Sequence, residues 1–147
     1  MKILIGGASS KFFHLKEFAD ALTKFDVEYK LVNDTEISDG YPSRKISNWF
    51  SNSNKFKKLI NDFKPDVIGI SAVSEQYYKA NELAEKMKRI TNVPLILGGT
   101  HITAIPSQLL NSTFKIGVIG EGERTFLEFI NMYKKEKSIS DENHNCF

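Results

Sequence analysis

Cysteine is almost absent from this sequence of 147 residues: the single thiol is that of Cys146, close to the C-terminal end. One cysteine cannot form a disulfide framework within the chain, and it cannot supply the several thiolates of a protein-only zinc or iron–sulfur site. We therefore expect no metal site built by this chain alone, which is compatible with the reducing cytosol.

Long hydrophobic runs are missing as well. The sequence has no apolar stretch of about 18 residues, and the strand-like ILI after Lys2 is too short for a signal-peptide core. It also lacks an excess of charge, because 20 lysines and arginines oppose 18 aspartates and glutamates, for a net charge of +2. These absences predict a soluble, cytoplasmic protein that binds neither membranes nor nucleic acid.

Phosphate-binding loops are the third absence. After the first strand-like run the chain reads GGASSKFF, which matches neither the GxGxxG fingerprint of dinucleotide sites nor the GxxxxGK[ST] loop of nucleoside-triphosphate sites. A phospho-receiver domain would need an aspartate at the end of the third strand, where Ser71 stands. The sequence therefore supports none of these three classes.

What the sequence does contain is an alternation of short apolar runs with apolar stripes at helical spacing. The stripes predict helices over residues 12–25, 56–63, 75–90 and 123–135, and Pro106 favours the start of one further short helix. The runs predict five strands: Lys2–Gly6, Val27–Val32, Asp66–Ser71, Pro94–Gly98 and Ile116–Gly120.

Such an alternation is typical of an α/β fold with a parallel sheet covered by helices on both faces. The first, third and fourth runs are apolar throughout, as central strands must be, whereas the second alternates Glu28 and Lys30 with apolar residues and so belongs at an edge. We predict a single Rossmann-like, flavodoxin-like doubly wound sheet of five strands in the order 2-1-3-4-5, with a ligand crevice between strands 1 and 3. Residues 1–135 form this domain, and residues 136–147 form a polar tail or the start of a connector.

The segment from Asp34 to Asn52 does not fit the alternation and is long for a loop in a compact domain. We expect it to hold a short helix that carries Ile46, Trp49 and Phe50. Two interpretations stay open: Trp49 and Phe50 fold back on the core, or they form a docking surface for a ligand or a second domain.

Glycine gathers where parallel strands are expected to end. Open α/β sheets bind ligands at this edge, and a missing Cβ lets a ligand or another backbone approach the main chain. Tight turns also need glycine, so one pair alone has a structural explanation, but three pairs at one edge predict a binding site. Six of the nine glycines lie there: Gly6, Gly7, Gly98, Gly99, Gly120 and Gly122.

Polar side chains follow the same strands. Ser71 and Ser74 come after the third strand, and Glu121 and Glu123 after the fifth. The structural alternative is that Ser71 caps a turn and that the glutamates favour the positive end of the last helix. The serine hydroxyl groups can both donate and accept hydrogen bonds without carrying charge.

The region from Pro65 to Ile130 resembles the cobalamin-binding domain at the N-terminus of B12-dependent radical SAM proteins. Three motifs carry the resemblance: the serine-containing loop SAVS after strand 3, GGTH with a following proline after strand 4, and GEGERTF after strand 5. The N-terminal half fits by fold but has no diagnostic motif.

This resemblance implies a cobalamin cofactor, with the corrin over the strand ends and the nucleotide tail in the crevice between strands 1 and 3. Ser71 would then hydrogen-bond the buried tail, and Gly98 and Gly99 would let its ribose–phosphate part lie against the main chain. The cofactor-binding residues predicted in this way are Gly6, Gly7, Ser9, Ser71, Ala72, Val73, Ser74, Gly98, Gly99, Thr100, His101, Gly120, Glu121 and Gly122.

One departure concerns the cobalt. Many related domains carry DxHxxG after strand 1, whose histidine ligates cobalt from below, but here that position reads GASSKFF. We therefore expect base-off, His-off cobalamin without a lower ligand from the protein. His14 is expected on a helix surface, and His101 at the rim as a hydrogen-bond partner of the corrin or its tail.

A second departure concerns catalysis. Radical SAM chemistry needs a CxxxCxxC cluster motif, and this chain has only Cys146. We expect no catalytic residue here: the 4Fe–4S cluster and S-adenosylmethionine would belong to a radical SAM domain in cis, to which KSISDENHNCF is the expected connector.

Two alternatives come from other classes. The first 34 residues look somewhat like the opening of a sugar-nucleotide-dependent glycosyltransferase, in which a glycine-rich turn approaches the substrate. The other alternative is a cobalamin-like fold that binds no cofactor and acts through protein contacts of Trp49 and Phe50.

Overall fold

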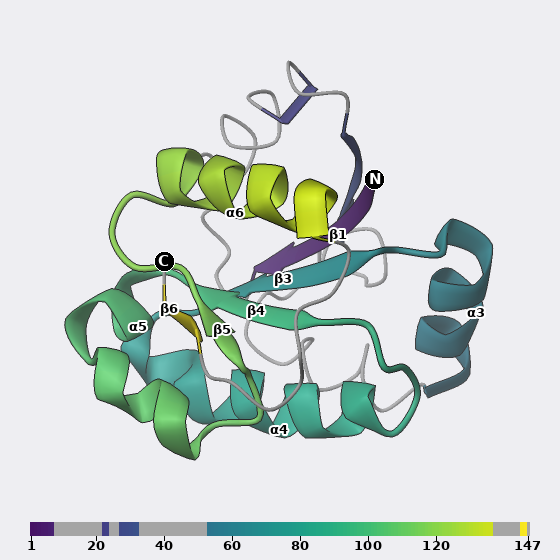
Figure 1. Cartoon of the computed structure of the whole chain (residues 1–147). Coiled ribbons are helices and arrows are strands. Elements are labelled where there is room, and N and C mark those ends of the chain that lie inside the picture. Colours follow the sequence, from purple (N-terminus) through teal and green to yellow (C-terminus); the bar gives the residue numbers. More distant parts are fainter. Residues whose placement is uncertain (8–21, 24–26, 33–52, 137–144, 147) are drawn as a thin grey trace.

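A computed structural model describes residues 1–7, 22–23, 27–32, 53–136 and 145–146 of the chain (Figure 1). Most of the first expected helix lies outside these residues, and so does the whole expected helix within residues 34–52. The predictions for Ser9, His14, Trp49 and Phe50 therefore fall outside the described residues.

The described strands form one parallel sheet in the order β2-β1-β3-β4-β5-β6. This confirms the predicted order 2-1-3-4-5 and the edge position of the second strand. A short sixth strand, which the sequence analysis did not anticipate, pairs with β5 within the segment interpreted as a tail. The strands are β1 (Lys2–Gly7), β2 (Glu28–Val32), β3 (Val67–Ser71), β4 (Leu95–Gly98), β5 (Ile116–Gly117) and β6 (Asn145–Cys146).

Burial explains the strand order. In β3 the four residues from Val67 to Ile70 are all buried, because helices cover both faces of a central parallel strand. In β2 the alternating Glu28 and Lys30 are exposed, as the edge position allows. Strand β5 is shorter than predicted, since after Val118 the chain turns away through Gly120, which has a φ of +82°.

The helices are α3 (Ser53–Phe63), α4 (Tyr77–Lys88), α5 (Thr100–Ala104) and α6 (Gly122–Glu136), with 3₁₀ turns η2 (Ser74–Gln76) and η3 (Pro106–Asn111). The helix expected over residues 75–90 thus begins as a 3₁₀ turn. Helix α5 was not predicted, because five residues between a glycine and a proline show no apolar stripe. No described helix has the length and apolarity that crossing a membrane requires.

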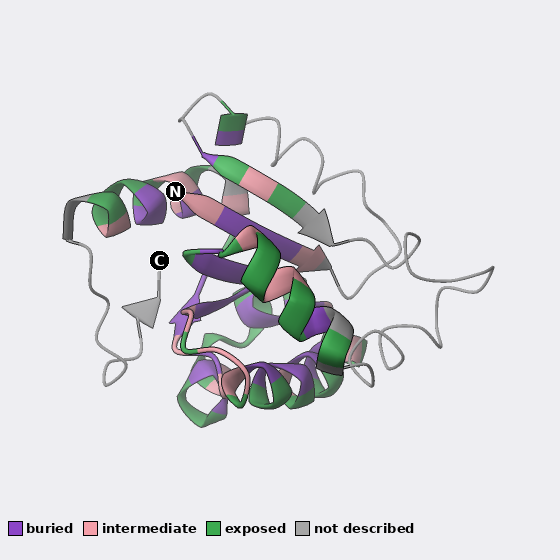
Figure 2. Ribbon diagram, turned by 90° about the vertical axis from the view of Figure 1, so that its right-hand side faces the viewer, coloured by how far each residue is buried: buried purple, intermediate pink, exposed green. Residues whose placement is uncertain are grey.

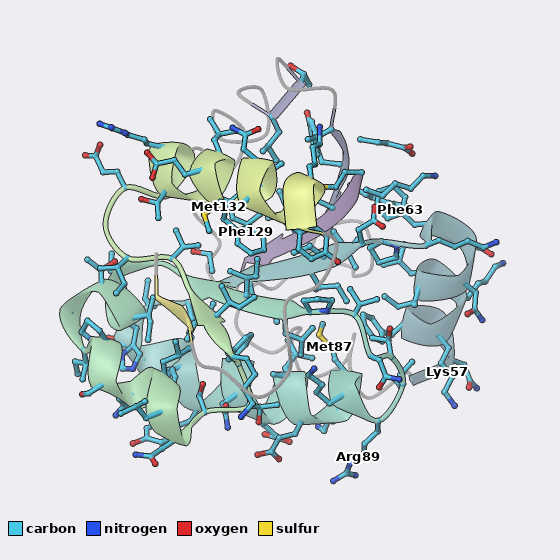
Figure 3. All side chains as sticks on the ribbon, in the orientation of Figure 1. Lys57, Phe63, Met87, Arg89, Phe129 and Met132 are labelled. Atoms are coloured by element: carbon cyan, nitrogen blue, oxygen red, sulfur yellow. The ribbon has the colours of Figure 1, made fainter. Side chains whose placement is uncertain are left out.

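Two apolar layers hold the sheet between the helices. Met87 of α4 and Phe129 of α6 point toward the sheet from opposite sides (Figure 3), and each belongs to a separate buried cluster. The buried stripe of α4 faces the sheet while its other side is exposed (Figure 2). Buried clusters therefore lie on both faces of the sheet.

Candidate functional site

The ends of three adjacent strands meet at one edge of the sheet. In the register, Gly7 of β1 lies beside Ser71 of β3, and Ser71 lies beside Gly98 of β4. We call this edge the carboxyl rim and define it as residues 6–7, 71–74, 98–103 and 118–122. Apart from Ser9, all predicted site residues lie within it, which is the position where open α/β sheets bind ligands.

Two glycines of the carboxyl rim leave open space. An ideal Cβ on Gly6 or on Gly120 would have no described heavy atom within 4 Å. Gly98 is less free, because its Cβ would lie 3.9 Å from Cβ of Val118, an ordinary van der Waals distance. A flat ligand can therefore approach the main chain at Gly6 and Gly120 without displacing any described atom near these two positions.

Gly99 is glycine for a different reason. Its φ is +101°, and a Cβ there would lie 2.6 Å from the carbonyl oxygen of Ala72 and 2.9 Å from Oγ of Ser71. The protein's own loop after β3 thus fills the space that the sequence analysis assigned to the ribose–phosphate of a ligand. We correct that interpretation: the bare backbone of Gly99 admits another backbone.

Gly69, in the middle of β3, is not among the site residues predicted from the sequence. It is buried, yet an ideal Cβ would meet no described heavy atom within 4 Å. In the register it lies beside Ile5 and Ile96, which belong to the cluster on the α6 face. Since Ser71 is two residues further along the same strand, both positions share that face. A glycine that interrupts the run DVIGIS was the available sequence signal, because glycine in a strand interior marks a close approach.

The side chain of His101 is buried beneath the carboxyl rim and is not exposed at its surface. Its side chain is only 5% exposed. Nδ1 lies 3.1 Å from Oγ of Ser74, and Nε2 lies 3.0 Å from Oε1 of Gln108. The ring stacks on that of Tyr77 with centroids 4.2 Å apart. The structure therefore contradicts the expectation that a ring nitrogen of His101 reaches the corrin, because both nitrogens bind inside the protein.

Thr103 joins the loops after β4 and β5. Its hydroxyl donates to the carbonyl of Gly99 at 2.9 Å and accepts from the N–H of Gly120 at 3.0 Å. Thr103 is not among the site residues predicted from the sequence. The available signal was its position four residues after Gly99, from which a helical threonine can reach the preceding carbonyl.

The carboxyl rim carries little charge. None of its residues is a lysine or arginine, and Glu121 is exposed to solvent. Within the described part of the chain, no three histidine, cysteine, aspartate or glutamate residues gather closely enough to hold a metal ion. Beneath the rim, burial raises the pKa of Tyr77 and keeps its hydroxyl neutral. These described residues can offer hydrogen bonds, bare backbone and apolar contacts, but none of them is a cationic partner for a nucleoside diphosphate.

A parallel α/β sheet with helices on both faces and glycines at the carboxyl ends of its strands defines the class: a doubly wound, flavodoxin-like α/β domain. The particular family follows from sequence comparison, in which residues 37–130 match the family model of the B12 binding domain. The chain belongs to this family. The glycosyltransferase alternative, which depended on the first 34 residues, is not supported.

Curated relatives are similar over part of this chain. An uncharacterized methyltransferase from Pyrococcus horikoshii is 34% identical over 85 residues, which are 56% of this chain and 18% of the relative. An anaerobic magnesium-protoporphyrin IX monomethyl ester cyclase from Rubrivivax gelatinosus is 29% identical over 90 residues, or 59% of this chain and 16% of the relative. The chain therefore spans less than a fifth of these relatives.

Solved structures show the same fold. The radical S-adenosylmethionine methyltransferase TsrM from Kitasatospora setae, with cobalamin and a [4Fe-4S] cluster bound, matches with a TM-score of 0.72 at 14% identity, over 95% of this chain and 25% of that chain. The cobalamin-dependent S-adenosylmethionine radical enzyme OxsB, with aqua-cobalamin bound, matches with a TM-score of 0.65 at 18% identity, over 98% and 20%. The chain is thus a B12-binding domain that resembles those of B12-dependent radical SAM enzymes.

Proposed function

We propose that this chain binds base-off cobalamin at the carboxyl rim and presents it to a radical SAM domain of the same protein. The observation that carries the proposal is that an ideal Cβ on the buried Gly69, two residues before Ser71 on the same face of the sheet, would meet no described heavy atom within 4 Å. The long nucleotide appendage of cobalamin needs a narrow space free of side chains, and we infer that it lies beside this glycine; we call this inferred space the slot.

The residues at the rim fit this cofactor. Gly6 and Gly120 leave room for the corrin over the strand ends, and Ser71 offers a hydroxyl to the appendage at the top of the slot. Gly69, with Ile5 and Ile96 beside it, gives the slot a bare, apolar floor for the terminal base. This chain's share of the work is to bind, to orient and to exclude water.

The histidine chemistry supports a His-off mode. In the described part of the chain, His101 is the histidine of the carboxyl rim, and both of its nitrogens have partners within the protein. It therefore has no free lone pair for cobalt. Bound cobalamin would supply a cobalt centre that carries and transfers a methyl group.

The partner domain is inferred from length. Because the chain covers 25% of TsrM and 20% of OxsB, those proteins contain much more than this domain. Both are radical S-adenosylmethionine enzymes by name, which supports a cis domain that holds the 4Fe–4S cluster and S-adenosylmethionine.

Titration with hydroxocobalamin tests the binding mode. We expect a shift of the visible spectrum to the base-off form, and co-elution of the corrin with the protein on gel filtration. No spectral change and no co-elution at high micromolar concentration would overturn the proposal and favour the fold without cofactor binding. A UDP-sugar titration run in parallel should show no binding.

The variant Gly69→Val tests the slot. A valine side chain should fill the space of the terminal base and weaken cobalamin binding by about tenfold to a hundredfold. Cobinamide, which lacks the nucleotide appendage, is the matched control ligand, and its affinity should change by less than about twofold because the rim itself is intact. An equal loss for both ligands would show that Gly69 does not face the appendage.

A further inference from the structure

The buried imidazole of His101 lies between two polar side chains from different segments. Ser74 follows β3, and Gln108 belongs to η3. Burying an imidazole without hydrogen bonds is costly, so both ring nitrogens of a buried histidine require partners. Here both have one, and the stacked ring of Tyr77 holds the imidazole plane at an angle of 25° to its own. We call these four residues the His101 network.

The partners of the two ring nitrogens indicate where the hydrogens lie. With the amide of Gln108 placed so that Oε1 faces the ring, this oxygen can only accept, and Nε2 of His101 then carries a hydrogen. In a neutral imidazole Nδ1 is then a bare acceptor, so the hydroxyl of Ser74 must donate to it. A serine hydroxyl has a single hydrogen, and this one is directed into the protein.

The hydroxyl of Ser74 can therefore only accept a hydrogen bond from a ligand. Ser74 is exposed at the carboxyl rim, and a free serine there could rotate to donate or to accept. With its hydrogen committed to His101, Oγ offers only lone pairs to the outside. The periphery of a corrin carries primary amides, whose N–H groups are the donors that such an oxygen accepts.

The backbone keeps this arrangement in place. The N–H of His101 donates to the carbonyl of Ala72 at 3.3 Å, and the N–H of Ala72 donates to the carbonyl of Gly98 at 3.0 Å. The hydroxyl of Tyr77 lies 3.4 Å from the carbonyl oxygen of Gln108. The loops after β3 and β4 are therefore joined by main chain and side chains together.

We propose that His101 is a positioning residue that makes Ser74 an obligate hydrogen-bond acceptor for an amide side chain of the corrin. This inference depends on the proposed cobalamin binding and deepens it. It predicts selectivity: the site should prefer an amide over a carboxylate at the same corrin position, because a carboxylate has no hydrogen to donate and repels the lone pairs of Oγ.

The experiment compares the affinities of cobalamin and of its monocarboxylic acids, in which one propionamide is hydrolysed. One of these acids is hydrolysed at the amide that donates to Ser74. Against this isomer we expect the wild-type chain to prefer cobalamin by about tenfold, because the acid loses one hydrogen bond and places a carboxylate against the lone pairs of Oγ. His101→Phe, which keeps a stacking ring, frees the hydroxyl to rotate and should lower this preference to about twofold or less. Ser74→Ala should do the same, and the double variant should add nothing.

The matched control is Ser107→Ala, which removes a hydroxyl from an exposed position of η3 and should leave the preference unchanged. An equal preference in the wild-type chain, His101→Phe and Ser74→Ala would overturn the inference while cobalamin binding still stands. If wild type binds no corrin, the proposed function fails instead.

Nitrogen NMR of the imidazole gives a second readout that needs neither a ligand nor a variant. The neutral tautomer with hydrogen on Nε2 supports the inference. Hydrogen on Nδ1 would overturn it, because Ser74 would then accept from the ring.

Discussion

The two ends of the sheet are built from opposite chemistry. At the amino end, the ammonium group of Lys2 lies 3.3 Å from the carboxylate of Glu28 and 5.4 Å from the ring centroid of Phe63, and the backbone N–H of Lys2 donates to Asp66 at 2.7 Å. The carboxyl rim has bare backbone and hydroxyl groups in place of such pairs. Among the described residues, charged side chains thus pair at the amino end, whereas the carboxyl rim presents glycine backbone, hydroxyl groups and one exposed carboxylate, that of Glu121.

Within the carboxyl rim a second contrast separates glycines that look alike in sequence. Gly99 has a positive φ and a backbone neighbour where its Cβ would be, whereas Gly6 has open space. The first glycine is required by the fold, and the second is available to a ligand. Substituting alanine at each position tests this distinction directly.

We expect Gly99→Ala to have the largest effect on stability. The left-handed backbone and the overlap with the carbonyl of Ala72 should together cost about 2–5 kcal/mol of unfolding free energy. Gly6→Ala should instead leave stability unchanged or raise it by up to about 1 kcal/mol, because the unfolded chain loses freedom and the new methyl group meets no described atom. Urea unfolding of both variants measures the difference, and equal losses would refute the distinction.

The sequence predicted the sheet better than the rim. Strand order followed from local patterns, since an apolar run shows a central strand and the alternation at Glu28 and Lys30 shows an edge. The burial of His101 has no local signal, because its partners lie 27 and seven residues away and are brought together only by the packing of α5 against η2 and η3. Strand β6 likewise has no apolar pattern, as two residues are too few to show one.

The amino end also contains the reverse case, a position that favours glycine but lacks it. Lys64, between α3 and β3, has a φ of 51°, and its N–H donates to the carbonyl of Ile60 at 2.8 Å, as in a helix C-terminal cap. Lys64→Gly should therefore raise the unfolding free energy by about 0.5–1 kcal/mol, since glycine adopts this conformation without strain. Cobalamin affinity should not change, because Lys64 lies at the end of the sheet opposite the carboxyl rim. A loss of stability in thermal unfolding would contradict this prediction.

The smallest effect should come from Tyr133 of α6, whose hydroxyl donates to the carbonyl of Asp66 at 3.4 Å. Burial first, and then the negative charge of Asp66, raise the pKa of Tyr133 above its ordinary value of 10.0. Because the folded pKa is the higher one, this contribution to stability is complete below pH 10 and is lost as the pH rises through the folded pKa. Tyr133→Phe should therefore make unfolding free energy fall less steeply above pH 10, by less than about 1 kcal/mol since the ring is only partly buried. Urea unfolding at pH 8 and pH 11 measures this difference. An equal fall of the unfolding free energy in the wild-type chain and in Tyr133→Phe would show that the raised pKa of Tyr133 does not contribute to stability.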